Sequence, residues 1–236
     1  MLEIIVGGCS DDVHTNSRSF FITRALATKS SSLILSSLHP SHTTIYLSSI
    51  SPMAFQNYIN YCHSSIYSIG RPSPPDRPMH ENTLSYLLGS VLKDEDYQRC
   101  AFVALYNLME PLARSMHSKA ALSNMRASDV DFACCNSPDG SPLRRLFFDA
   151  VASHWTRLEA KVIKDLFNAR CNNYNANGAA IRSLAWPDMY RKYVDFRAVI
   201  ALSALFPDSK RGQLLRHVDE YIGSRKNEEM KKERVK

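Results

Sequence analysis

Three short apolar stretches near the start of the chain have the length and spacing of β-strands. In the first, Leu2, Ile4 and Val6 fall on one face while Glu3 and Ile5 fall on the other, which is the period of two that a strand requires. The pattern predicts strands at residues 2–6, 19–23 and 43–47. We therefore expect a small sheet in the first fifty residues.

After the third strand the apolar spacing changes to three and four residues. Ser51 suits an N-cap, because its hydroxyl can accept a hydrogen bond from an unpaired backbone N–H, and Pro52 suits the first helical position. One face of this expected helix is apolar and carries Phe55, Tyr58, Ile59 and Cys62.

Helical spacing dominates from Glu81 to the end of the chain. Asp94 is expected to cap one helix, and Pro111 to kink or restart it. A helix opening at Ser141-Pro142 should bury Leu143, Leu146, Phe147, Ala150 and Val151. Further helices are expected at residues 157–168, from 187 to 205, and from about 209. The predicted fold class is α+β and mostly helical: a small sheet with a cluster of helices, followed by an all-helical extension.

Three segments interrupt these patterns. Residues 68–80 are rich in proline and are expected to form a surface loop; a docking peptide for an aromatic groove is the alternative. Residues 134–141 and 172–178 are expected to be polar turns. The vicinal pair Cys134-Cys135 is interpreted as two core thiols beside the first of these turns.

Composition and charge narrow the class of protein. Hydrophobic residues make up 44% of the chain and charged residues 22%, which is typical of a globular protein. We expect neither a signal peptide nor a membrane span, because the first residues lack a basic start and the apolar runs are short. The six cysteines form no C-x-x-C pair, so we expect reduced thiols and an intracellular location, in the cytoplasm or nucleus.

Candidate chemistry is sparse. His39 and His42 lack a third ligand at a useful spacing, and the carboxylates from Asp94 to Asp96 are explained by a helix start. The basic pairs Arg144-Arg145 and Arg191-Lys192 are interpreted as solvated helix faces. We therefore expect no catalytic residue, no cofactor and no metal. An enzyme whose site is assembled from scattered residues is the alternative.

Four segments, taken in order, resemble BTB (POZ) proteins of the form common in fungi, the first three within the BTB domain and the last in a stretch that follows the domain in many fungal members. They read FFITRALATKS, TIYLSSISPMAFQNYINYCHS, LSYLLGSVLKDEDYQRCAFVAL and SPDGSPLRRLFFDAV. The chain is similar to a divergent member. Thr23 and Ser51 stand where the family usually has His and Asp, and the Tyr-Thr-Gly that usually follows the third helix is absent.

The resemblance implies a BTB/POZ-like domain over residues 1–110, which includes the proline-rich insert. A helical extension at 111–222 and a charged tail at 223–236 would follow. The implied function is protein–protein interaction without catalysis, as a homodimerising scaffold or adaptor. Self-association is expected through the first strand and the first helices, and Leu2, Ile4 and Val6 would give an apolar face beside an unpaired strand edge.

Two other functions stay open. Family members often act as substrate adaptors of a cullin ubiquitin ligase, and Ile66 and Tyr67 lie where the cullin contact is expected, although the usual Glu is missing there. The other alternative is a nucleic-acid-associated regulator. Its basic end would be the tail from Arg225, which carries half of the net charge of +6, yet the alternation of Lys and Arg with Glu makes a nucleic-acid partner the weaker interpretation.

Overall fold

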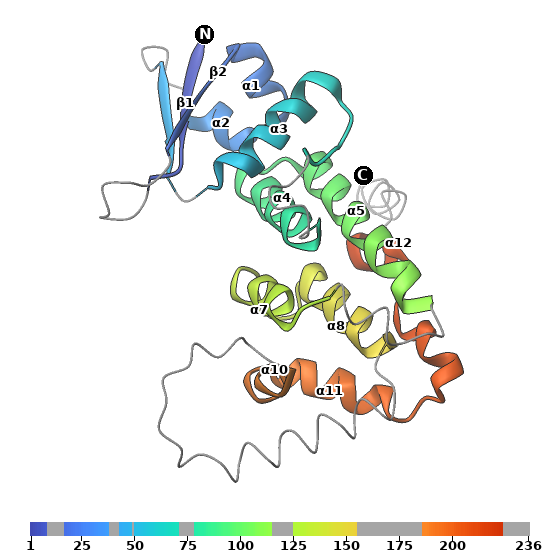
Figure 1. Cartoon of the computed structure of the whole chain (residues 1–236). Coiled ribbons are helices and arrows are strands. Elements are labelled where there is room, and N and C mark those ends of the chain that lie inside the picture. The colour runs from blue at the N-terminus through green and yellow to red at the C-terminus, as the bar shows by residue number, and fades with distance from the viewer. Residues whose placement is uncertain are drawn as a thin grey trace, which may run out of the picture. The chain divides into compact units, whose positions relative to one another are not determined.

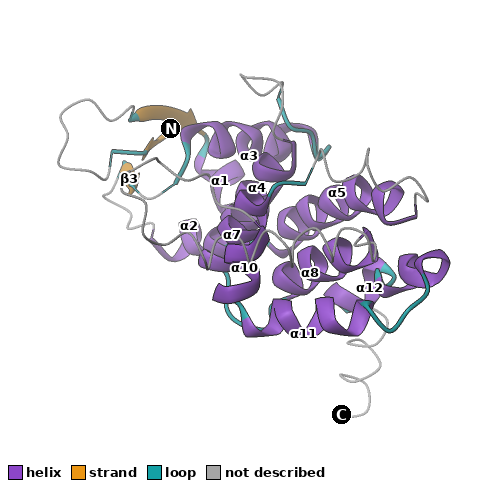
Figure 2. Ribbon diagram, turned by 60° about the horizontal axis from the view of Figure 1, so that its bottom comes forward, coloured by secondary structure: helices purple, strands orange, loops and turns teal. Residues whose placement is uncertain are grey.

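A computed structural model of the chain describes residues 1–8, 17–37, 43–48, 50–70, 78–114, 125–154 and 186–223 (Figure 1). The chain divides into two compact units, Met1–Leu105 and Tyr106–Lys236. Helices make up most of the described residues, and the strands all belong to the first unit (Figure 2). The α+β, mostly helical class expected from the sequence is therefore confirmed.

The first unit holds a three-stranded mixed sheet in the order β2-β1-β3. The strands span Leu2–Val6 (β1), Arg18–Ile22 (β2) and Thr44–Leu47 (β3). β1 pairs antiparallel with β2 and parallel with β3, so that Ile4 lies beside Phe20 on one side and Ile45 on the other. The predicted strands agree with these bounds to within one residue at each end.

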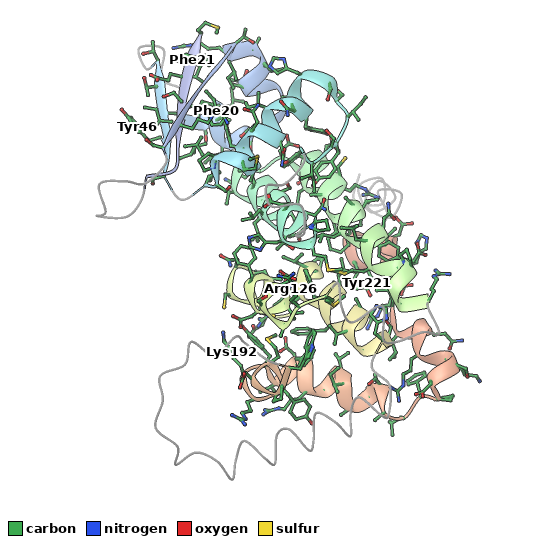
Figure 3. All side chains as sticks on the ribbon, viewed as in Figure 1. Phe20, Phe21, Tyr46, Arg126, Lys192 and Tyr221 are labelled. Carbon is green, nitrogen blue, oxygen red and sulfur yellow. The ribbon has the colours of Figure 1, made fainter. Side chains whose placement is uncertain are left out.

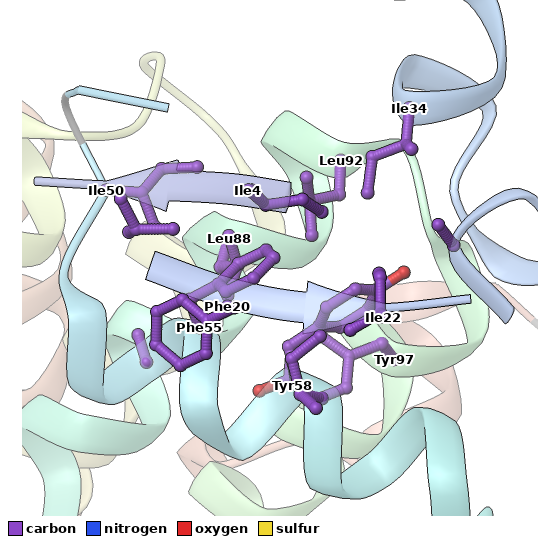
Figure 4. Close-up of a cluster of buried hydrophobic side chains, with 14 of the residues drawn as sticks. Ile4, Phe20, Ile22, Ile34, Ile50, Phe55, Tyr58, Leu88, Leu92 and Tyr97 are labelled. Atoms are coloured by element: carbon purple, nitrogen blue, oxygen red, sulfur yellow. The ribbon is translucent and has the colours of Figure 1, made fainter. Parts of the chain in front are cut away.

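Helices α1 (Arg24–Ser30), α2 (Ser32–Ser37) and α3 (Pro52–Ser64) lie on one side of this sheet (Figure 1). The side chains that β1 and β2 direct toward these helices are almost inaccessible to water; Leu2, Ile4 and Val6 are each 0% exposed. Figure 4 shows Ile4 and Phe20 packed with Phe55, Tyr58 and Leu88 in this core. The period-two pattern of the strands thus supplies the inner wall of the first unit.

α4 (Pro78–Leu92) and α5 (Glu95–Arg114) follow, joined by a sharp turn at Lys93, whose φ is 54°. Asp94 caps α5 as predicted: its Oδ1 accepts a hydrogen bond from the backbone N–H of Tyr97 at 2.9 Å. α5 continues through Pro111 without restarting. α4 begins earlier than Glu81, at the end of the proline-rich segment, of which residues 71–77 lie outside the described part.

In the second unit, α8 (Pro142–His154) is the helix on which the others pack. Its neighbours are α7 (Ala127–Cys135), α11 (Val194–Ser203), a 3₁₀ helix η1 (Asp208–Leu214) and α12 (Val218–Ile222). α10 (Trp186–Lys192) packs on α7 and α11. The predicted inward residues of α8 are all buried: Leu143, Leu146, Phe147, Ala150 and Val151.

The sequence-based helix limits in this unit need two corrections. The helix expected from 187 to 205 is interrupted at Tyr193, which ends α10 and N-caps α11. The helix expected from 209 is instead a 3₁₀ helix followed by the short α12. The predictions for residues 157–168, 172–178 and 224–236 lie outside the described residues, as do His39, His42 and two of the six cysteines, Cys9 and Cys171.

Candidate interaction surface

The side of the sheet away from α1–α3 carries exposed aromatic side chains. The strand register places six residues there, here called the outer sheet face: Glu3, Ile5, Ser19, Phe21, Thr44 and Tyr46. Phe21 is 62% exposed and Tyr46 is 72% exposed. Figure 3 shows Tyr46 on the side of the strands away from the helices and Phe20 on the side that faces them.

Cross-strand pairing fixes the positions of these side chains. Phe21 on β2 lies beside Glu3 on β1, and Tyr46 on β3 lies beside Ile5. The Thr44 hydroxyl donates a hydrogen bond to the Glu3 carboxylate at 3.4 Å, which links β3 to β1 on this face. Two large aromatic groups are therefore held on opposite edge strands with the half-buried Ile5 on the strand between them.

The predicted contact residues of β1 do not form part of this face. Leu2, Ile4 and Val6 belong to the core, and β1 is the central strand with β2 and β3 on its two sides. The expectation of an exposed apolar face beside an unpaired edge is therefore wrong for β1. The sheet edges are β2 and β3, and the exposed apolar groups come from the alternate register positions.

The two residues expected at a cullin contact differ in exposure. Ile66 is 69% exposed, just after α3 ends. Tyr67 is held in place: its hydroxyl donates to Asn82 Oδ1 at 2.8 Å and its ring lies 5.5 Å from that of Tyr97. Burial raises the pKa of Tyr67 to about 12. Of the two, only Ile66 offers an apolar side chain to a partner.

A cluster of polar side chains in the second unit ties α7 to α10. Asp131 Oδ1 accepts hydrogen bonds from Lys192 Nζ and from the Tyr193 hydroxyl, each at 2.7 Å. Burial opposes ionisation of Asp131, but these two hydrogen bonds outweigh it and lower the pKa of the carboxyl. Cys135 Sγ lies 3.5 Å from both the Tyr193 hydroxyl and Lys192 Nζ. Each polar group in the cluster has a hydrogen-bond partner, which is typical of a structural contact that holds two helices together.

Two sequence interpretations are corrected here. Arg144 is not a solvated residue: it is 4% exposed, forms an ion pair with Asp139 and lies over the Tyr193 ring at 5.2 Å. Cys134 and Cys135 are the last residues of α7 rather than part of the turn. Cys134 is buried, and burial raises its pKa to about 11, whereas Cys135 is exposed.

Neither a metal centre nor a membrane segment is found in the part of the chain that the structure describes. Within it, no three His, Cys, Asp or Glu side chains gather as metal ligands. The helices described there also fall short of the length and apolar character needed to cross a bilayer.

Comparison with known proteins adds no relative. No protein-family model, no curated protein and no solved structure matches the chain.

Proposed function

We infer that the chain is a non-catalytic protein–protein interaction module of the BTB/POZ type, acting as a scaffold or adaptor. One observation carries this proposal: the outer sheet face presents Phe21 and Tyr46 to solvent at 62% and 72% exposure. Aromatic residues are enriched among the groups that supply most of the binding energy in protein interfaces.

The exposed area is large enough to matter for binding. An aromatic side chain buries about 150–250 Å², and each Å² of apolar surface removed from water contributes about 25 cal/mol. With the exposed fractions of Phe21 and Tyr46, complete burial of either ring would contribute about 3 kcal/mol before the costs of association. That is the size of effect seen at interface hot spots.

The arrangement of the first unit supports the BTB/POZ part of the proposal. The resemblance implies a small sheet packed on a cluster of helices, and the sheet in the order β2-β1-β3 with α1–α3 on one side has that form. The other side of the sheet is the one on which Phe21 and Tyr46 lie.

The proposal is tested by affinity capture with the tagged full chain and quantitative mass spectrometry. The double variant Phe21→Asp/Tyr46→Asp should lose at least ten-fold of each specifically captured protein, because it places two charges on the contact surface. Asn60→Asp, at an exposed position of α3, is the matched control and should retain capture. Equal capture by both variants, with both shown to be folded by circular dichroism, contradicts the proposal.

The cullin alternative gives a different outcome in this experiment, and the nucleic-acid alternative is tested by a separate binding assay. A cullin adaptor would capture a cullin. Ile66 is exposed, so Ile66→Ala should abolish this capture, while Phe21→Asp/Tyr46→Asp should retain it. A nucleic-acid-associated regulator would bind DNA or RNA with an affinity that falls steeply as salt rises.

A further inference from the structure

β3 lies at one edge of the sheet, with one side open. Among the strands that the structure describes, β3 pairs only with β1, and none lies beyond it. The Thr43 and Leu47 carbonyls accept hydrogen bonds, at 2.8 Å and 3.2 Å, from backbone N–H groups within and just after β1. Since consecutive residues of a strand direct their backbone groups to opposite sides, Thr44 and Tyr46 direct theirs to the open side.

The open side therefore offers four backbone groups in a row, the N–H and C=O of Thr44 and the N–H and C=O of Tyr46. Their spacing is that of a β-ladder, so another extended backbone is the partner that can satisfy all four together. Natural proteins commonly protect such an edge with Lys, with Pro or with a bulge. The sequence of β3, TIYL, contains neither a charged residue nor a proline, so the edge lacks these protections.

The inner side of the sheet is also less well covered at β3 than at β2. Phe20 and Ile22, the inward residues of β2, are 7% and 3% exposed. Ile45 and Leu47, the inward residues of β3, pack against the same core but are only half-buried. Of the two sheet edges, the one at β3 therefore has apolar surface left on its inner side.

A fourth strand beside β3 would cover apolar surface on both faces of the sheet. Its residue opposite Tyr46 would point to the outer sheet face, where Tyr46 is 72% exposed, because directly opposite residues share a face. The residues before and after that one would point inward, toward Ile45 and Leu47. The edge therefore favours an extended segment whose successive residues are apolar, such as Val, Ile, Phe or Tyr, and disfavours Pro at the paired positions.

We propose that the edge of β3 binds an extended, apolar segment of a partner protein, which adds to the sheet as a fourth strand. The proposal rests on the inferred interaction function and names the kind of partner segment that the sheet would bind. Backbone hydrogen bonds would supply affinity, and the side chains beside Ile45, Tyr46 and Leu47 would supply specificity. β3 has 4 residues, so the contact falls among small interfaces, and we expect a dissociation constant in the micromolar range.

A displayed library of random peptides, selected on the full chain, supplies the probe. Enriched peptides should share a Pro-free apolar stretch as long as β3, and their affinity is measured by fluorescence anisotropy of the labelled peptide. Thr44→Pro should weaken binding at least ten-fold, because it removes a backbone N–H from the open side and leaves the pairing with β1 intact. Thr44→Val is the matched control: it keeps that N–H, loses the hydroxyl bonded to Glu3, and should bind like wild type. A library that yields no binder of this pattern overturns the proposal, as does binding that survives Thr44→Pro.

Amide hydrogen exchange of the wild-type chain, followed by NMR, gives a second test that needs no variant. In the free chain the amides of Ile45 and Leu47, which face β1, should exchange slowly, and those of Thr44 and Tyr46 should exchange fast. A saturating amount of the selected peptide should slow exchange at Thr44 and Tyr46 at least ten-fold. Slow exchange at these two positions in the dilute free chain would mean that another part of the chain covers the edge, which overturns the proposal. Slowing that follows chain concentration without peptide would identify a second copy as the occupant, which overturns it as well.

The same variants separate the edge site from the inferred function. Loss of peptide binding in Phe21→Asp/Tyr46→Asp, together with full binding in Thr44→Pro, would reject strand addition and leave the inferred function standing. Slowed exchange at Thr44 and Tyr46 with the peptide, in a chain whose captured proteins do not depend on Phe21 and Tyr46, would contradict the inferred function and leave the edge site standing.

Discussion

Replacing Asp94 with Ala should destabilise the first unit by about 3 kcal/mol. The carboxylate makes two contacts: Oδ1 caps α5 through the Tyr97 N–H at 2.9 Å, and Oδ2 accepts from the Tyr58 hydroxyl at 3.2 Å. Loss of an N-cap costs about 1 kcal/mol. Tyr58 is 1% exposed, so its hydroxyl would be left buried with only the weak sulfur acceptor of Cys62, which costs a further 1–3 kcal/mol or so.

A double-mutant cycle with Tyr58→Phe separates the two contributions. In wild type, Tyr58→Phe removes a hydrogen bond and should cost about 1 kcal/mol. In the Asp94→Ala background the same substitution removes a buried hydroxyl that has already lost its carboxylate acceptor, so it should cost little or restore stability. We therefore expect a coupling energy of at least about 1 kcal/mol between the two positions.

The positions of the tryptophans allow the two units to be followed separately. Both tryptophans, Trp155 and Trp186, belong to the second unit, so their fluorescence during urea unfolding reports on that unit. Amide hydrogen exchange of β1 reports on the first unit. Asp94→Asn is the matched control, because its amide oxygen can still cap the helix at the Oδ1 position while its NH2 group, at the Oδ2 position, can donate to the Tyr58 hydroxyl. The reasoning would be refuted if Asp94→Ala changed the free energy of unfolding of the first unit, measured by hydrogen exchange, by less than about 0.5 kcal/mol. A coupling energy near zero would refute it as well.

The remaining predictions concern three other buried positions. Tyr221→Phe removes the hydrogen bond of 2.8 Å from the Tyr221 hydroxyl to the buried Asp149 carboxylate, and should lower the urea stability of the second unit by about 2 kcal/mol, measured by tryptophan fluorescence; an unchanged midpoint would contradict it. Burial lowers the pKa of His154 to about 4, below its unfolded value of about 6.5. Between these two pH values the unfolded state binds a proton at His154 and the folded state does not. The stability contributed by neutral His154 should therefore be fully present above about pH 6.5, and the free energy of unfolding should fall by on the order of 1 kcal/mol per pH unit below it. His154→Leu should reduce this pH dependence, measured by urea unfolding at pH 7 and pH 5. Gly89→Ala would place a Cβ 2.8 Å from the backbone of Gln98 and should cost about 1–3 kcal/mol by far-UV circular dichroism melts; a melt like that of wild type would mean that α4 and α5 separate easily.

Local patterns predicted the elements of the first unit well. Alternation located the strands, and the residues that close helix ends, Ser51 and Asp94, are both caps in the structure. Alternation does not encode sheet order, because a central strand and an edge strand can carry the same pattern. This is why β1 was expected at an edge while the exposed aromatic residues were missed. The adjacent Phe20 and Phe21 were a signal for them, since neighbouring strand positions point to opposite faces.

The second unit was harder to predict because its contacts join residues far apart in the chain. Arg144 is buried by the Tyr193 ring, almost fifty positions away, and nothing near Arg144 indicates that partner. The spacing of apolar residues from Val194 to Leu205 predicted a helix, but apolar residues fall on two opposite sides of it, so the spacing could not show which side is covered. The exposure of Val194, Leu202 and Leu205 could be recognised only once α11 was seen packed on α8.

The continuity of α5 has a consequence for dividing the protein into fragments. The boundary between the two units, after Leu105, falls within this helix rather than in a loop. A fragment ending there would carry eleven of the twenty residues of α5, and the complementary fragment would begin with the other nine. Leu105 and Tyr106 are both buried, so each fragment would expose an apolar helix end at the cut. Split-protein designs should therefore place the break elsewhere, and an expression trial of either half should keep the whole of α5 with it.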